Sequence, residues 1–104
     1  MKKHERYIER NDLKGATHLE VSVFYDKGGA NYFSGGTNPR GYYFSVRPVT
    51  KRDGMVSFVM FAGRKQFLCE TARYTDKQFD RAVKMASAFE DQLIADVVAE
   101  NIAA

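Results

Sequence analysis

The sequence has few of the residues that build metal, disulfide and nucleophilic sites. It holds one cysteine, Cys69, and two histidines, His4 and His18, which stand apart from each other and from the cysteine. A single cysteine excludes an internal disulfide, and histidines without partners at ligand spacing argue against a zinc site. Cys69 lies in a strand-like alternation with no histidine nearby in the sequence, so we interpret it as a structural thiol and not as a nucleophile.

Long apolar runs and phosphate-binding glycine motifs are also absent. No run approaches the ~20 residues of a membrane-spanning helix, and no signal-peptide core follows the basic start, so we expect a cytoplasmic protein. The Gly63-Arg64-Lys65 segment lacks the remaining residues of a P-loop, and Gly28-Gly29 does not open a helix as a dinucleotide fingerprint does. No acid, base and nucleophile converge in the sequence. We therefore expect neither an enzyme nor a cofactor.

Length and charge favour one folded domain with a polarised surface. The chain has 104 residues, of which 44% are hydrophobic and 28% charged, a composition typical of a globular domain with one modest core. The net charge of +3 is unevenly distributed, because residues 1–75 hold 13 basic and 7 acidic residues whereas residues 76–104 hold 3 and 6. A basic front of this kind permits binding to a polyanion.

Hydrophobic periodicity predicts an α+β fold. Residues 1–17 are polar and form, in our interpretation, an N-terminal extension to a single domain at 18–104. Alternation of apolar and polar residues, with short turns such as Asp53-Gly54 between the segments, predicts a four-stranded antiparallel β-meander. The predicted strands lie at about 18–25, 41–49, 55–62 and 66–73.

The segment from about 76 to 102 predicts one long C-terminal α-helix packed on one face of the sheet. Thr75 and Gln78 have the spacing of a capping box, and Tyr74 and Phe79 that of a hydrophobic staple. Apolar residues recur along one side of the helix, as packing on a sheet requires. This apolar stripe consists of Phe79, Ala82, Val83, Ala86, Phe89, Leu93, Ile94 and Val97.

A helix of this length would overhang its own sheet. It would be ~40 Å long, whereas an eight-residue strand spans ~27 Å. We therefore predict a homodimer through the second half of the helix, with Ile94, Val97 and Val98 at the interface. Glu90 falls within the apolar arc and is expected either to reach water or a basic residue at the sheet margin, or to pair across the dimer.

The segment from Tyr25 to Val49 is unusually rich in glycine and aromatic residues. It holds five glycines and six aromatic residues. One interpretation is a long β-hairpin whose rings pack on their own sheet. The other is that loop 26–41 lifts Tyr32 and Phe33 toward a partner, since loops on a rigid scaffold often carry binding residues.

Basic and aromatic residues on or between the strands suggest a function. A sheet that offers cations to phosphates and rings to bases is a common way of holding single-stranded nucleic acid, although the same residues would also suit a solvated outer face. We predict a non-catalytic nucleic-acid-binding protein; the alternative is a small regulator or inhibitor that binds a host protein through loop 26–41. The predicted nucleic-acid contacts are Arg40, Tyr43, Arg47, Arg64 and Lys65.

Three segments carry a resemblance. With YDKGGANYFSG, RGYYFSVRPV and GMVSFVMFAGRK, the chain resembles small accessory proteins encoded on conjugative elements and prophages of gut Firmicutes and Bacteroidetes. The resemblance implies a mobile genetic element in a bacterial cytoplasm, and it brings no established activity or site residue with it. The predicted layout is also similar to the Whirly and transcriptional-coactivator type of single-stranded-DNA-binding fold, which pairs through its helices, but that is a similarity of architecture alone.

Overall fold

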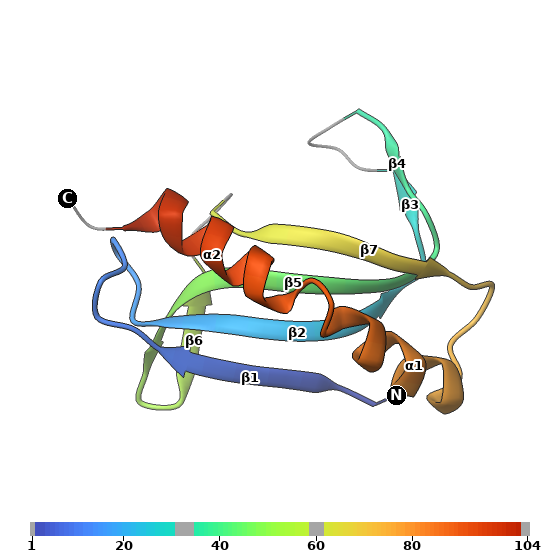
Figure 1. Cartoon of the computed structure of the whole chain (residues 1–104), viewed down its shortest axis with the longest axis horizontal. Coiled ribbons are helices and arrows are strands. Elements are labelled where there is room, and N and C mark those ends of the chain that lie inside the picture. The colour runs from blue at the N-terminus through green and yellow to red at the C-terminus, as the bar shows by residue number, and fades with distance from the viewer. Residues whose placement is uncertain (1, 31–34, 59–61, 103–104) are drawn as a thin grey trace.

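The computed structural model describes residues 2–30, 35–58 and 62–102, and in it an antiparallel sheet lies beneath two C-terminal helices (Figure 1). The expected α+β class is confirmed. The sheet has more than four strands, however, and the C-terminal segment forms two helices instead of one. The elements are β1 (His4–Glu9), β2 (His18–Asp26), β3 (Gly29–Ala30), β4 (Thr37–Asn38), β5 (Gly41–Arg52), β6 (Met55–Phe58), β7 (Arg64–Glu70), α1 (Asp76–Ala86) and α2 (Glu90–Asn101).

Strand β5 lies at the centre of the sheet. One edge of β5 pairs with β2 from Gly41 to Val49. The other edge pairs first with β7 and, at the far end of β5, with β6. Because β6 and β7 share this edge, they run one after the other in the same direction. The predicted four-stranded meander is therefore wrong at this point, because β7 pairs with β5 and not with β6.

The hairpin between β5 and β6 forms as predicted. Asp53 and Gly54 have φ values of 50° and 77°. Two successive positive φ angles are the mark of the type I′ turn, whose twist matches that of the strands it joins.

Residues 4–9, which we expected to lie in a polar extension, form the edge strand β1. It pairs with β2 in an antiparallel register that puts Tyr7 opposite Glu20. This strand is difficult to recognise in the sequence. Ile8 is its residue that packs against the core, while its charged side chains are exposed. Charged side chains of this kind are common on edge strands, where they discourage pairing with other chains.

The hydrophobic core lies between the sheet and the two helices. Strands β2 and β5 supply the largest fully buried side chains of this layer, which include Leu19, Val21, Tyr42, Phe44 and Val46. All eight residues of the predicted apolar stripe belong to this core or pack against it, so that prediction is confirmed. None of the described helices is long and apolar enough to cross a membrane.

Helix α1 begins at the predicted cap. Thr75 accepts a hydrogen bond from the backbone N–H of Gln78 at 3.2 Å, and the rings of Tyr74 and Phe79 lie 6.0 Å apart, as a staple requires. The reciprocal half of the capping box does not form. Instead, the Thr75 N–H donates to the Tyr42 hydroxyl at 3.2 Å, which ties the start of the helix to the central strand.

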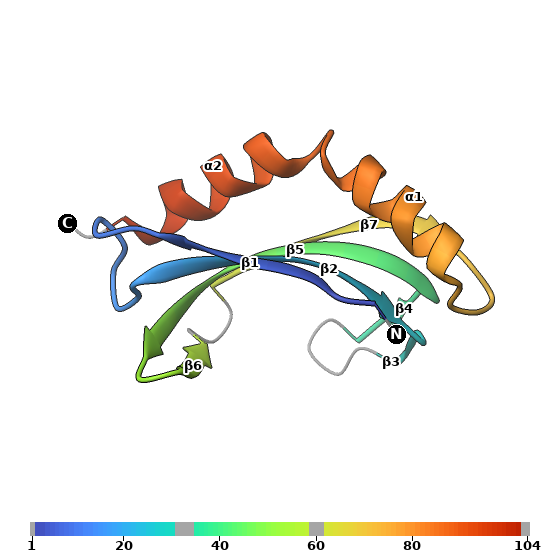
Figure 2. The same ribbon diagram turned by 90° about the horizontal axis from the view of Figure 1, so that it is seen from below.

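The predicted single helix is interrupted at residues 87–89, although no glycine or proline stands there. Backbone N–H groups of Ala88 and Phe89 donate three residues back, to Met85 and Ala86, and the Ser87 hydroxyl donates to the Lys84 carbonyl at 2.6 Å. Figure 2 shows the reason for the interruption: the sheet is arched, and two short helices follow the arch more closely than one straight helix could.

The expected dimer stripe belongs to the core of its own chain. Val97 is completely buried, and Ile94 and Val98 pack against the same cluster. The end of α2 is also held by its own chain, since the Lys14 N–H donates to the Asn101 carbonyl at 2.7 Å. These three side chains are therefore not a free interface, and the homodimer stays a prediction.

Glu90 pairs with Arg6 of strand β1. Its side chain is 30% exposed. The carboxylate thus sits at the margin of the sheet with a basic partner from the same chain, which is the first of the two outcomes expected for it.

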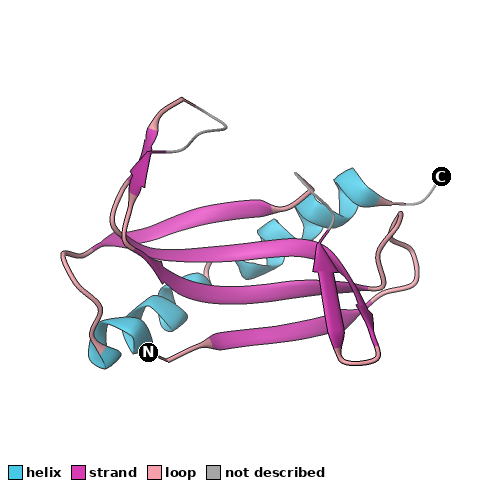
Figure 3. Cartoon of the chain, turned by 180° about the vertical axis from the view of Figure 1, so that it is seen from behind, coloured by secondary structure: helices cyan, strands magenta, loops and turns pink. Residues whose placement is uncertain are grey.

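The side of the sheet away from the helices is named here the open face, and Figure 3 views the molecule from this side. The β5–β6 hairpin bends toward this side at one end of the sheet, and the β3–β4 ribbon lies on the same side at the other end (Figure 2). The open face is therefore the surface on which side chains are neither covered by helices nor committed to the core.

Candidate functional site

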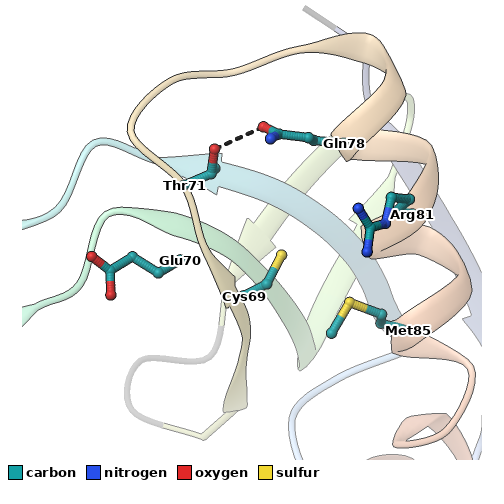
Figure 4. A pocket seen from close by; sticks show the side chains of 6 residues that line it. All are labelled: Cys69, Glu70, Thr71, Gln78, Arg81 and Met85. Atoms are coloured by element: carbon teal, nitrogen blue, oxygen red, sulfur yellow. Dashed lines mark hydrogen bonds between the residues drawn. The ribbon is translucent and has the colours of Figure 1, made fainter.

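Two hollows were compared as candidate sites. The first, of about 230 Å³, lies between the end of β7 and helix α1, as Figure 4 shows. Thr71 donates a hydrogen bond to Gln78 across its rim at 2.7 Å. Cys69 is the one thiol in its lining, and none of the six lining residues is a histidine that could serve as its base. Its lining consists of Cys69, Glu70, Thr71, Gln78, Arg81 and Met85.

The second hollow, of about 420 Å³, lies on the open face and brings cations, carboxylates, hydroxyls and an aromatic ring together. Strand register divides its surroundings into three cross-strand rows. They are an ion-pair row (Tyr7, Glu20, Arg47), a serine row (Glu5, Ser22, Ser45, Lys65) and an aromatic row (Phe24, Tyr43, Phe67).

The ion-pair row contains the one buried charged side chain among the described residues. Glu20 is 5% exposed, and its Oε1 accepts a hydrogen bond from Arg47 Nε at 2.7 Å and forms an ion pair with Arg47 Nη2, also at 2.7 Å. Its other oxygen accepts from the Tyr7 hydroxyl at 3.1 Å. These charge-assisted bonds compensate the carboxylate for the water it has lost.

Tyr7 is protonated at all ordinary pH values. Burial and the hydrogen bond to Glu20 raise the pKa of Tyr7 to about 12. The Lys51 ammonium lies 4.5 Å from the centre of the ring, a cation–π contact that brings the bent hairpin over this end of the open face. Tyr7 therefore keeps its proton and donates a hydrogen bond to Glu20, with the Glu5 carboxylate as a second, longer acceptor at 3.3 Å.

The aromatic row closes the opposite side of the hollow. The Phe24 and Tyr43 rings lie 5.8 Å apart with an interplanar angle of 17°, and the Phe67 ring lies 5.2 Å from that of Tyr43. Tyr43 is only 3% exposed and donates to the Pro39 carbonyl at 2.6 Å. Burial also raises its pKa. Of the two rings nearest the hollow, Phe24 is thus the one that reaches it.

The serine row forms the floor between these two larger rows. Ser22 lies directly opposite Ser45, and the row continues to Glu5 at one edge and to Lys65 at the other. The Lys65 ammonium lies 4.7 Å from the centre of the Tyr43 ring. Lys3, which precedes β1, adds a second lysine to the lining.

Of the five predicted nucleic-acid contacts, the structure brings three to the open face, namely Tyr43, Arg47 and Lys65. Tyr43 is buried there and is not available for stacking. Arg64 lies on the helix side of the sheet, where it pairs with Glu100 of α2. Tyr32 and Phe33, which were predicted to bind a partner from loop 26–41, lie outside the residues that the structure describes.

Arg40 stands at the end of the sheet and binds backbone. Its Nε donates to the Lys27 carbonyl at 2.9 Å and its Nη1 to the Ala72 carbonyl at 3.2 Å. The first bond holds the start of the β3–β4 ribbon, and the second connects Arg40 to the segment before α1. We therefore assign Arg40 a structural role, in place of the predicted contact with a ligand.

Sequence reasoning missed the other residues of the hollow, although part of the signal was present. Alternation in β2 already separates Glu20, Ser22 and Phe24 from the buried Leu19, Val21 and Val23. The contribution of β1 could not be found, because its residues were not recognised as a strand.

Charge differs strongly between the two layers. Helix α2 carries four acidic residues and no basic one. The open-face hollow is lined by three cations and two carboxylates, one of which is buried in its pair with Arg47. An anionic ligand is therefore favoured at the open face and disfavoured along α2.

Within the ranges that the structure describes, no group of three or more histidine, cysteine, aspartate or glutamate residues could hold a metal ion. Comparison of the chain with models of protein families, with curated proteins and with solved structures finds no match. The open face is therefore the feature of this chain that points to a function.

Proposed function

We propose that this protein is a non-catalytic binding domain that holds single-stranded nucleic acid on the open face of its sheet. The observation that carries the proposal is the hollow in which Lys3, Arg47 and Lys65 surround serine hydroxyls and the Phe24 ring, on the side opposite the acidic helix α2. Cations attract the phosphates, and an aromatic ring stacks with a base.

The two lysines supply the electrostatic part of this interaction. Lys3 and Lys65 lie at the outer strands and keep their ammonium groups near solvent, where they can approach phosphate oxygens without disturbing the core. Arg47 is partly exposed, at 40% of its side chain, but is held by Glu20. Its main contribution is to keep the buried carboxylate neutralised, so that the face does not repel phosphate.

Single strands suit this face better than duplexes because the aromatic contact needs an unstacked base. In a duplex the base faces are already stacked on one another, and only groove edges and phosphates are accessible. The affinity for a single strand should therefore have two contributions: phosphate contacts, which weaken with salt, and base stacking, which does not depend on salt.

A second candidate is the regulator that binds a host protein through loop 26–41. One observation favours it: the β3–β4 ribbon projects from the body of the sheet (Figure 1), and its base is held by Arg40 and by a 2.7 Å bond from the Gly28 N–H to Asp26. A ribbon with a fixed base can present its tip to a partner. Either function would suit an accessory protein of a mobile genetic element in a bacterial cytoplasm, as the resemblance implies.

The decisive experiment is a titration of labelled single-stranded and duplex oligonucleotides with the purified protein at about 50 and 200 mM salt, the range in which counterion release is readily measured. We expect micromolar or tighter binding of the single strand at the lower salt, weaker binding of the duplex, and a steep loss of affinity at the higher salt. Absence of single-strand binding at the lower salt would reject the proposal and direct attention to the ribbon.

A further inference from the structure

The hollow has the form of a slot with a low floor and two high walls. Resting on the function proposed above, we propose further that this slot takes one unstacked nucleobase, which stands with its edge on the hydroxyls of Ser22 and Ser45. The ligand of the slot is thus a base of a single strand, and the lysines at its ends hold the adjoining phosphates.

The strand register creates the slot. Successive rows on one face of a strand are two residues apart, or ~6.7 Å, so the ion-pair row and the aromatic row are separated by ~13 Å with the serine row between them. Serine is much shorter than the glutamate and arginine on one side and the phenylalanine on the other. A flat ring about 3.5 Å thick can therefore stand on the serines between the two walls.

The walls and floor match the surfaces of a base. Phe24 lines the hollow, and the nearly parallel ring of Tyr43 lies beside it in the same row and restricts its movement. The Arg47 guanidinium and Glu20 carboxylate form the opposite wall, and a guanidinium plane is a second surface on which bases stack. Because the two walls are ~13 Å apart, a base that enters the slot stacks on the Phe24 ring or on the guanidinium plane and does not contact both.

The serine hydroxyls of the floor can bind the edge of a base, but they distinguish only weakly between one base and another. A serine hydroxyl both donates and accepts, so Ser22 and Ser45 can adjust to the donors and acceptors on the edge of any base. We therefore expect the slot to distinguish a strand with bases from one without, and to show little sequence preference.

The lysines determine the direction of the bound strand. The serine row ends at Lys65 on one outer strand and at Glu5 on the other, beside Lys3. These ends are three strand spacings apart, or ~14 Å. The sugar–phosphate chain would accordingly cross the strands, with one phosphate near Lys65 and another near Lys3.

The test compares two oligonucleotides of equal length and phosphate number, an oligothymidylate and the same chain with abasic sites throughout. Stacking of one base typically strengthens binding by about 5- to 150-fold. We expect wild-type protein to bind the oligothymidylate about tenfold or more tightly than the abasic chain. Ser45→Leu, which fills the slot without a change of charge, should remove this difference.

The matched control is Ser57→Leu, the same substitution at an exposed strand position outside the hollow. It should bind both chains as the wild type does. If Ser45→Leu fails to give the wild-type circular dichroism spectrum, Ser22→Val provides the same obstruction with a residue that favours strands.

The outcomes separate the two proposals. Equal binding of both chains by wild-type protein would overturn the slot and leave nucleic-acid binding through phosphates intact. An undiminished preference in a folded Ser45→Leu protein would likewise overturn the slot. No binding of either chain at about 50 mM salt would overturn the proposed function and the slot together.

Discussion

Glu20 and Arg47 lie directly opposite each other in the two central strands, and one oxygen of the Glu20 carboxylate accepts a hydrogen bond from Arg47 Nε and forms an ion pair with Arg47 Nη2. The carboxylate is almost entirely removed from water, whereas the guanidinium keeps part of its surface exposed. A buried carboxylate in this position depends on its partner, because it cannot be hydrated in the partner's absence.

Replacement of Arg47 should destabilise the protein mainly because the Glu20 carboxylate would stay buried without its cation. The loss of the Arg47 contact itself should matter less. Arg47→Met keeps an unbranched apolar stem of similar bulk but removes the guanidinium and leaves Glu20 buried without its cation, and we expect the free energy of unfolding to fall by about 2–4 kcal/mol. The double variant Glu20→Gln/Arg47→Met should recover much of this loss, since a neutral amide can still accept from Tyr7. Urea denaturation of both variants measures the difference; an equal loss in the two would contradict the dependence of Glu20 on Arg47.

Tyr7 should make the protein sensitive to alkaline pH. Its folded-state pKa of about 12 lies above the ~10 of free tyrosine. Between these values the native state keeps a proton that the unfolded chain has lost, so the stabilisation is complete below about pH 10 and is lost as the pH rises through about 12. We expect the melting temperature of Tyr7→Phe to fall less steeply than that of the wild type over this range.

Two further tyrosines require a spectroscopic control, because burial also raises the pKa of Tyr43 and Tyr74. The phenolate absorbance of wild-type protein, followed through the alkaline range, should contain a late-titrating component that Tyr7→Phe lacks. An unchanged titration curve in Tyr7→Phe would show that the Glu20 hydrogen bond does not hold the proton on Tyr7.

Strong local signals in the sequence predicted much of the fold. The alternation in 18–26 and 41–49, the Asp53-Gly54 turn and the Thr75 cap each depend on neighbouring residues, and each is found in the structure. The interruption at residues 87–89 could not be predicted, because it follows from the arch of the sheet and not from a helix-breaking residue. Strand β1 was missed for a similar reason, since its polar sequence becomes a strand by pairing with β2.

The candidate site was predictable only in part. Alternation placed Arg47 and Tyr43 on one face, but the burial of Tyr43 depends on Phe24 and Phe67, whose positions follow from cross-strand register. The register shift between Tyr42 and Tyr43 also puts Arg64 on the helix side. No local pattern specifies such a shift.

Gly41 is the position at which that pairing tolerates no side chain. A Cβ atom there would lie 2.1 Å from the Cys69 carbonyl oxygen. Gly41→Ala should therefore force β5 and β7 apart and lower the free energy of unfolding by about 3 kcal/mol or more. The comparison is Gly35→Ala, where a Cβ atom would have no atom of the described residues within 4 Å and the φ of 74° is the obstacle that the structure shows, with a cost of about 1–2 kcal/mol. Equal losses in the two variants would show that the close approach of Gly41 to β7 does not govern stability.

Arg64 and Lys65 are neighbours in the chain on opposite faces of the sheet, which makes them a matched pair for testing the binding face. Arg64 pairs with Glu100 of α2, and Lys65 lines the open-face hollow. Arg64→Gln and Lys65→Gln each remove one positive charge, so both variants have the same net charge. Any difference in their nucleic-acid binding must therefore come from the face on which the charge stood.

We expect Lys65→Gln to weaken single-strand binding severalfold at low salt and to reduce the slope of log affinity against log salt by about 0.7, the loss of one phosphate contact. Arg64→Gln should leave the slope unchanged, and the loss of its exposed ion pair with Glu100 should change stability little. Fluorescence anisotropy over a series of salt concentrations measures both slopes. A slope reduced by Arg64→Gln and not by Lys65→Gln would place the bound strand on the helix side, where the acidic residues of α2 would have to be overcome.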